Sequence, residues 1–127
     1  MPADQVVVDA SAFAALLFGE PAGREIANRL EGHLLFAPTL LRYELASVCL
    51  KKAAEEPPKK ERLLAALNLF PRLQVREVEV PSEDLVELAA ASGLTVYDAA
   101  YLWLSQELGA NMVSLDARLN AAIEKGV

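Results

Sequence analysis

The sequence predicts an α/β fold, in which helices cover both faces of a parallel sheet. Two observations support this prediction. Short apolar runs alternate with longer segments of helical pattern, and glycines and prolines separate them. Strands that alternate with helices form parallel sheets because the chain must cross back over one face between strands. The length of 127 residues fits one domain with a sizeable core.

The first half of the chain predicts two strands and three helices. In order, these are a strand of three valines at 6–8, a helix at 10–18, a helix with Pro21 in its first turn, a strand at 34–36 and a long helix from Pro38 and Thr39 to about residue 55. Pro57 and Pro58 end the long helix, because neither residue can donate a backbone hydrogen bond.

The second half repeats this alternation. It predicts a helix at 59–70, a weaker strand at 75–80, a helix at 82–92, a helix from Thr95 to about 109, a strand at 112–115 and a closing helix from Asp116 to about 125. Ser82 is expected to cap its helix, and Glu83 and Asp84 in the first turn complement the helix dipole.

Composition excludes several classes of protein. The single cysteine and single histidine, Cys49 and His33, exclude an internal disulfide and a metal site built on these residues. No apolar run could span a bilayer and no secretory leader is recognised, so we expect a cytoplasmic protein. The hydrophobic share of 54% leaves apolar surface to cover, which predicts a homodimer or a tight protein partner. The net charge of -6 means that any bound polyanion must meet a local basic patch or bound cations.

Three aspartates occupy positions where an α/β protein binds ligands. Asp9 and Asp116 follow predicted strands, and ligands of an open parallel sheet bind outside the carboxyl ends of its strands. Asp98 lies at the start of an apolar helix, three residues after Thr95. Each aspartate also has an ordinary explanation as a helix-capping residue. For Asp116 the capping role is favoured, and for Asp9 and Asp98 a capping role and a role in a ligand-binding site are evenly balanced.

Glu44 is harder to explain by capping. It is expected in the middle of the long helix, on the same apolar stripe as Leu40 and Val48. Arg42 is a poor partner because residues two positions apart face different directions. An acid in an apolar stripe needs a cation, or it becomes neutral through a raised pKa. A role in a site is therefore favoured over an ion pair with a distant arginine.

Convergence of the four acids would require cations. A pair of like charges at ~4 Å costs on the order of 4 kcal/mol at a surface-like dielectric. Ligands that are all oxygen select a hard ion, Mg²⁺ or Mn²⁺, which can polarise a phosphate oxygen and activate water for phosphodiester hydrolysis. Ser11 and Ser114 could position a metal-bound water, but a helix cap for Ser11 and an ordinary strand position for Ser114 are equally good explanations.

Four stretches resemble the acidic motifs of PIN-domain ribonucleases, most closely those of VapC-type toxins. They are residues 6–12 (VVVDASA), 42–46 (RYELA), 97–102 (YDAAYL) and 114–119 (SLDARL). They occur in order over nearly the whole chain, and the only mild departure is Ser114, where threonine is frequent in the family. The resemblance implies a PIN-like three-layer α/β/α fold with a central parallel sheet of four to five strands, in one domain over residues 1–127.

The resemblance also implies a metal-dependent endoribonuclease of a prokaryotic toxin–antitoxin pair. Asp9, Glu44, Asp98 and Asp116 would surround one or two Mg²⁺ or Mn²⁺ ions, and Ser11 matches the family's small hydroxyl position. Such proteins are commonly homodimers, held inactive by a VapB-like antitoxin whose tail covers the site. Candidate contacts to RNA phosphates are Arg42 and Arg118, and with less support Lys51 and Lys52, for which a solvated helix face is the better explanation.

Competing functions fit less well. A phosphatase of the Asp-x-Asp type needs an acid where Ser11 stands, and a phospho-receiver domain needs a paired acid and a late lysine that are not evident. No P-loop sequence occurs. The alternative from a different class is a PIN-like module that only dimerises or binds a protein. The complete set of four acids argues against that module.

Overall fold

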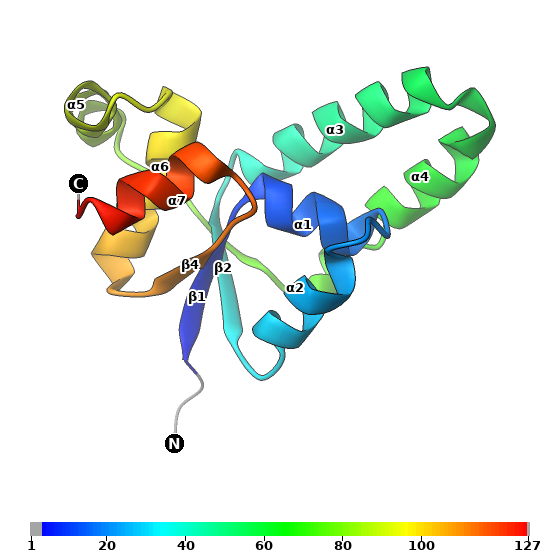
Figure 1. Cartoon of the computed structure of the whole chain (residues 1–127), viewed down its shortest axis with the longest axis horizontal. Coiled ribbons are helices and arrows are strands. Elements are labelled where there is room, and N and C mark those ends of the chain that lie inside the picture. Colours follow the sequence, from blue (N-terminus) through cyan, green and yellow to red (C-terminus); the bar gives the residue numbers. More distant parts are fainter. Residues whose placement is uncertain (1–3, 127) are drawn as a thin grey trace.

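The computed structural model describes residues 4–126 and has three layers, with helices on both faces of a parallel sheet (Figure 1). The strand order is β3-β2-β1-β4, and all three pairings are parallel. The strands are β1 (Gln5–Val8), β2 (Leu34–Pro38), β3 (Arg76–Val78) and β4 (Asn111–Val113). The predicted α/β fold with a four-stranded parallel sheet is confirmed.

The strand β1 lies between two neighbours and is the most deeply buried. Val7 pairs with Phe36 of β2 and with Met112 of β4, and both Val7 and Val8 have no exposed surface. This burial on both faces is what the run of three valines predicts. Because β1 and β4 are parallel, their carboxyl ends lie at the same edge of the sheet, where the chain continues into Asp9 and Ser114.

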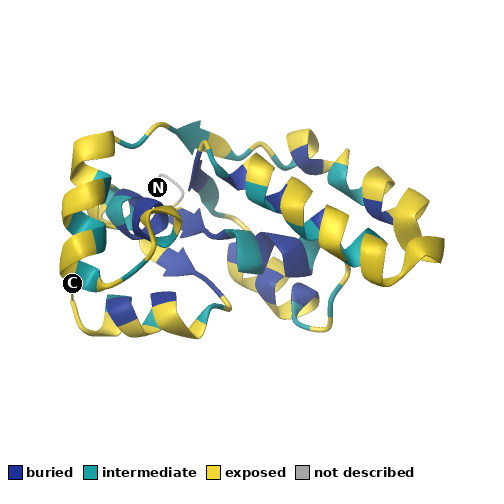
Figure 2. Cartoon of the chain, turned by 90° about the horizontal axis from the view of Figure 1, so that it is seen from above, coloured by how far each residue is buried: buried dark blue, intermediate teal, exposed yellow. Residues whose placement is uncertain are grey.

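Seven α-helices and two short 3₁₀ segments connect the strands within residues 4–126. They are α1 (Ala10–Leu17), α2 (Gly23–Leu30), α3 (Leu41–Glu55), η1 (Pro57–Lys59), α4 (Lys60–Leu67), η2 (Phe70–Leu73), α5 (Ser82–Ser92), α6 (Val96–Leu108) and α7 (Ala117–Glu124). Figure 2 shows that burial concentrates at the strands and α1, whereas the far end of the α3–α4 hairpin is exposed. The largest fully buried side chains include Phe13, Leu41, Leu45, Tyr101 and Leu119, which anchor α1, α3, α6 and α7 on the sheet.

Two predicted helix starts are wrong because prolines lie outside the helices. Pro38 ends β2, and α3 begins only at Leu41. Pro38 can occupy this place because it is the last residue of its strand, paired with Val78 at the end of the β2–β3 ladder. Pro21 lies in a turn before α2, which begins at Gly23. A Cβ atom on Gly23 would come within 2.4 Å of the Ala15 carbonyl oxygen, so this close approach of two backbones requires glycine.

Other boundaries also differ from the predictions. Ser82 is the first residue of α5 and does not cap it; Pro81 takes the N-cap position without a side-chain hydrogen bond. The predicted helix at 59–70 is divided among η1, α4 and η2. The strand β4 ends at Val113, because Ser114 turns away to make the contacts described below. No helix in the described part of the chain has the length and apolar character needed to cross a membrane.

Candidate functional site

Asp9 is buried at the carboxyl end of β1, and both of its carboxylate oxygens accept hydrogen bonds. The Ser11 hydroxyl donates to Oδ1 over 2.7 Å, and the Ser114 hydroxyl donates to Oδ2 over 2.6 Å. The Ala12 N–H also donates to Oδ1, which makes Asp9 the N-cap of α1. Asp9 therefore caps a helix and also lies in the candidate site, so the two roles are compatible.

The same two hydroxyls also accept backbone hydrogen bonds. Ser11 Oγ accepts from the Leu115 N–H and Ser114 Oγ accepts from the Asp116 N–H, both over 2.9 Å. The bond between Leu115 and Ser11 joins the start of α1 to the connection between β4 and α7, and the bond between Asp116 and Ser114 lies within that connection. In this structure the hydroxyls orient Asp9 directly, and their predicted contact with a metal-bound water stays a prediction.

Glu44 is half-buried and lies in the first turn of α3, not in mid-helix as predicted, because α3 begins at Leu41. Its Oε1 accepts a hydrogen bond of 2.6 Å from the Tyr101 hydroxyl. Burial raises the pKa of Glu44, the Tyr101 hydrogen bond opposes this rise, and the charges of Asp98 and Asp9 add to it. Within residues 4–126 Glu44 forms no ion pair, so the distant arginine considered as an alternative is not found.

Tyr101 is a site residue that the sequence analysis missed. Its side chain is buried, and burial together with the neighbouring Glu44 raises its pKa, so that the hydroxyl stays protonated and donates. Asp98 and Tyr101 are three residues apart on α6, a spacing that places them on one face of the helix. That spacing within the YDAAYL motif was the signal that could have identified Tyr101.

Asp98 and Asp116 lie at the starts of α6 and α7. The Thr95 hydroxyl accepts from the Asp98 N–H over 3.1 Å, which confirms one half of the expected capping box. Asp116 accepts from the Leu119 N–H over 3.0 Å, which confirms its expected role as a cap. Burial raises the pKa of Asp98, and repulsion from Asp116 raises it further.

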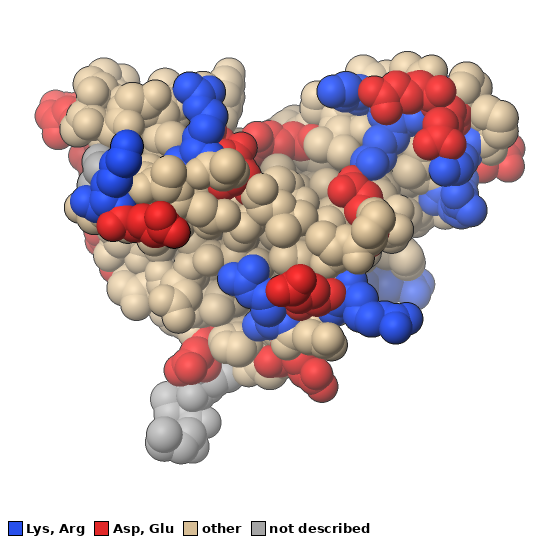
Figure 3. All heavy atoms as spheres, viewed as in Figure 1, with Lys and Arg blue, Asp and Glu red and all other residues tan. Residues whose placement is uncertain are grey.

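Pairwise electrostatic interactions connect the four acids, each with two of the others. Burial is the largest cause of the raised pKa of Asp9, to which the charge of Asp116 also contributes. The charges of Asp98 and Asp9 contribute to the raised pKa of Glu44, and the charge of Asp116 contributes to the raised pKa of Asp98. We call Asp9, Glu44, Asp98 and Asp116 the carboxylate ring. Figure 3 shows acidic atoms at the bottom of a hollow between the α3–α4 hairpin and the part of the molecule that contains α6 and α7.

The carboxylate ring suits a hard divalent cation in its chemistry, although it is not drawn together into a compact cluster. Within residues 4–126, no three acidic, histidine or cysteine side chains form a ready-made metal site. Mg²⁺ usually keeps several waters and needs only one or two carboxylates from the protein. Every donor in the ring is an oxygen, and a cation would relieve the repulsion that raises the pKa of Asp9, Glu44 and Asp98.

The predicted basic residues differ in their surroundings. Arg42 binds Glu77 through two hydrogen bonds, with its Nε 3.2 Å from Oε1, so its charge is already balanced. Arg118 is exposed in the first turn of α7, and its charge acts to lower the pKa of Asp98. Lys52 pairs with Glu20 over 2.8 Å, outside the site. Arg118 is therefore the predicted phosphate contact whose charge acts on the carboxylate ring.

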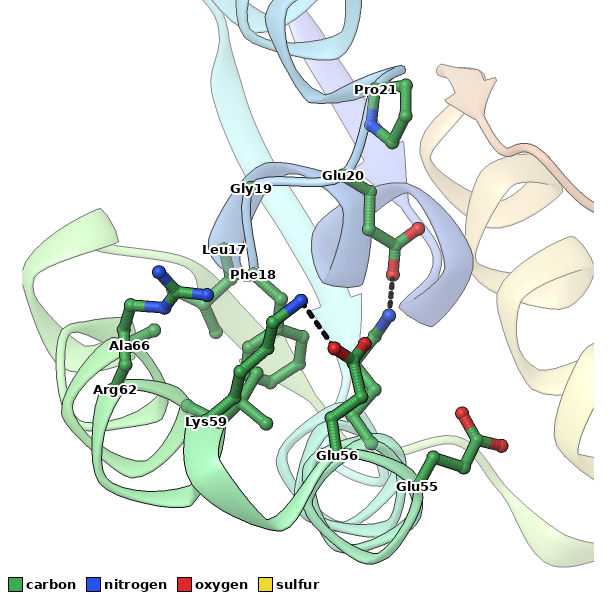
Figure 4. Close-up of a pocket in the computed structure, with 12 residues that line it drawn as sticks. Leu17, Phe18, Gly19, Glu20, Pro21, Glu55, Glu56, Lys59, Arg62 and Ala66 are labelled. Atoms are coloured by element: carbon green, nitrogen blue, oxygen red, sulfur yellow. Dashed lines mark ion pairs between the residues drawn. The ribbon is translucent and has the colours of Figure 1, made fainter.

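A cavity of about 590 Å³ lies elsewhere, between the α1–α2 turn and the α3–α4 hairpin (Figure 4). No member of the carboxylate ring lines it. Its charges are mixed: Lys52 pairs with Glu20, and Lys59 pairs with Glu56 over 2.7 Å. Because acids balance these lysines, the cavity offers no clear attraction for a polyanion.

Sequence comparison identifies the family. Residues 6–125 match the PIN domain. The chain belongs to the PIN-domain family. It is 34% identical to Ribonuclease VapC3 of Pyrobaculum aerophilum over 91% of this chain and 92% of that protein. It is 30% identical to Ribonuclease VapC12 of Mycobacterium tuberculosis over 94% of this chain and 97% of that protein. The resemblance to VapC-type PIN-domain ribonucleases is confirmed.

Two solved structures have the same fold. The crystal structure of PAE2754 from Pyrobaculum aerophilum has a TM-score of 0.76 and 24% identity, over 94% of this chain and 84% of that chain. The crystal structure of VapC20 from Mycobacterium tuberculosis, a sarcin–ricin loop cleaving toxin, has a TM-score of 0.66 and 18% identity, over 92% of this chain and 94% of that chain. At these identities the likeness shows the three-layer PIN fold.

The Tyr101 hydrogen bond can be tested on Glu44 without any metal. In Tyr101→Phe the ring keeps its packing but the donor is lost, so the ionised form of Glu44 is less stabilised and its pKa rises above the wild-type value. A carboxyl-carbon NMR titration measures this shift. Tyr97→Phe is the control, because the exposed Tyr97 hydroxyl has no hydrogen bond among the described contacts. An unchanged or lower Glu44 pKa in Tyr101→Phe would contradict the assigned bond.

The charge of Glu44 should destabilise the metal-free fold at neutral pH. Its pKa is raised above the ordinary 4.5, so stability is lost as pH rises through the folded-state value and the carboxylate ionises. Glu44→Gln keeps an acceptor for Tyr101 but cannot ionise. We expect its free energy of unfolding to exceed that of the wild type at about pH 8 and to match it at about pH 4, measured by urea denaturation with a chelator.

The exposed, mid-helix variant Glu87→Gln serves as the control and should show no pH-dependent gain. A wild type that is more stable than Glu44→Gln at about pH 8 would show that the ring does not strain the fold.

Proposed function

We propose that this chain is an endoribonuclease that hydrolyses RNA phosphodiester bonds with Mg²⁺ or Mn²⁺ held by Asp9, Glu44, Asp98 and Asp116. The observation that carries this proposal is the carboxylate ring. Burial raises the pKa of three of its members, and none of the four forms an ion pair within residues 4–126. The ribonuclease names of the relatives VapC3 and VapC12 support RNA as the substrate.

The protein's own residues would prepare the site before RNA arrives. Ser11 and Ser114 orient Asp9, and Tyr101 orients Glu44. Arg118, whose charge acts on Asp98, would contact a phosphate beside it. When bound, Mg²⁺ or Mn²⁺ supplies Lewis-acid polarisation of a phosphate oxygen and a water of lowered pKa. Preorganised ligands lower the cost of reorganisation during the reaction.

We also propose that the chain is the toxin of a type II toxin–antitoxin pair, active in the cytoplasm as a homodimer and inhibited by a VapB-like antitoxin. The identities with VapC3 and VapC12 support this assignment. Exposed apolar side chains on α3 and α5, Leu50 and Val86, offer surface that a second subunit or a partner protein could cover. A module that only binds protein would gain nothing from the mutual repulsion of four acids.

RNA cleavage tests the nuclease proposal. We expect the purified protein to cut a mixed RNA pool in Mg²⁺ or Mn²⁺ and not in a chelator. Asp9→Asn should lower the rate by about a thousandfold, because several kcal/mol of charge stabilisation depend on the metal ligands. Glu87→Gln should cut like the wild type. If wild type cuts nothing with either metal, or if Asp9→Asn cuts equally well, the proposed mechanism is wrong.

Expression in a bacterial host tests the toxin assignment. The wild-type chain expressed alone should arrest growth, and Asp98→Asn, which removes one charge from the ring, should not. Co-expression of a short reading frame directly upstream of the gene should restore growth. Normal growth with soluble wild-type protein present would contradict the toxin assignment while leaving the nuclease proposal intact.

A further inference from the structure

Three exposed apolar side chains border the carboxylate ring. Val96 and Tyr97 directly precede Asp98, and their exposed fractions are 43% and 64%. Leu115 directly precedes Asp116, and its exposed fraction is 44%. We call Val96, Tyr97 and Leu115 the apolar margin. Apolar side chains that stay exposed together beside a charged site point to a ligand that covers them.

One backbone contact and the positions of the three residues in the chain place the apolar margin beside the site. The Leu115 N–H donates to Ser11 Oγ, the same hydroxyl that donates to Asp9. Tyr97 precedes Asp98 in the first turn of α6, and Asp98 interacts electrostatically with Asp116 at the start of α7. The margin thus lies along the side of the ring that α6 and α7 build. Arg118, two residues after Asp116, adds an exposed positive charge there.

We infer that the apolar margin binds the base of an unpaired RNA nucleotide, stacked on the Tyr97 ring, while Arg118 contacts an adjoining phosphate. This inference rests on the proposed function and identifies residues that select its substrate. An unpaired nucleotide combines a flat, largely apolar face with a negatively charged phosphate, which matches an exposed aromatic ring beside an arginine. A base within a duplex is already stacked and cannot present its face, so the margin favours single-stranded RNA.

Tyr43 provides a matched comparison. It directly precedes Glu44, as Tyr97 precedes Asp98, and its exposed fraction of 75% is similar. However, Tyr43 lines an apolar cavity of about 340 Å³ between α3 and α4, together with Leu67 and Phe70. A base held beside the α6–α7 side of the ring would not meet it. Comparing substitutions of the two tyrosines therefore distinguishes a specific stacking role of Tyr97 from the general effect of removing an exposed ring.

The test compares RNA with and without bases. In the Asp9→Asn background, which blocks cleavage, fluorescence anisotropy measures binding of a labelled single-stranded RNA of about twelve nucleotides in the presence of Mg²⁺. A second strand of equal length carries abasic riboses. Tyr97→Ala should weaken binding of the normal strand about tenfold and leave binding of the abasic strand unchanged. Tyr97→Phe should bind like the parent because it keeps the ring, and Tyr43→Ala should leave both affinities unchanged.

Several results would overturn the inference. The inference is wrong if the normal strand shows no saturable binding, or if Tyr97→Ala weakens the binding of both strands equally. It is also wrong if Tyr97→Phe loses as much affinity as Tyr97→Ala, or if Tyr43→Ala loses affinity for the normal strand alone. If a protein partner and not a base covers the margin, Tyr97→Ala should change the affinity for both strands equally or not at all. Wild-type cleavage of the normal strand is measured alongside. If the variants bind RNA as expected but the wild type does not cleave the normal strand, the nuclease proposal alone is rejected. If the wild type cleaves the strand but Tyr97→Ala binds it as tightly as the parent, this inference alone is rejected.

Discussion

The pair of hydrogen bonds from Ser11 and Ser114 to Asp9 is the interaction on which the site depends. Asp9 follows the central strand and is buried, and a buried carboxylate without partners would be strongly unfavourable. Its two partners come from segments that are far apart in the chain, so forming these bonds also brings the β4–α7 connection against the start of α1. The hydrogen bonds to Asp9 therefore help to close the edge of the sheet at which the acids lie.

The other acids are placed at a cost to the fold. Glu44 and Asp98 are half-buried, and burial and neighbouring negative charge raise the pKa of each. The hydrogen bond that Tyr101 donates to Glu44 offsets part of this cost, and Thr95 acts to lower the pKa of Asp98, but neither residue provides a positive charge. A fold that keeps such a group of acids without an ion pair, as residues 4–126 do here, violates an ordinary rule of protein stability. Violations of this kind concentrate at functional sites, where strain and activity are linked.

The sequence predicted the features that depend on neighbours in the chain. The three valines identified the central strand, and the places of Asp9, Asp98 and Asp116 at helix starts followed from local pattern. Contacts between distant segments could not be predicted. The bonds of Tyr101 with Glu44 and of Arg42 with Glu77 join residues 57 and 35 positions apart. Pro38 also led to a wrong helix start, because a proline can equally end a strand or begin a helix.

The charge distribution limits how the proposed RNA binding could work. Its net charge of -6 repels a polyanion, Arg42 is balanced by Glu77, and Arg118 is the predicted contact whose charge reaches the carboxylate ring. Salt dependence of nucleic-acid binding grows with the number of phosphates that basic side chains neutralise. If the chain binds RNA as proposed, the affinity would come mainly from bound cations and from contacts with bases. Contacts with bases distinguish one RNA site from another, whereas contacts with phosphates do not, so the proposed nuclease would cleave selectively and not generally.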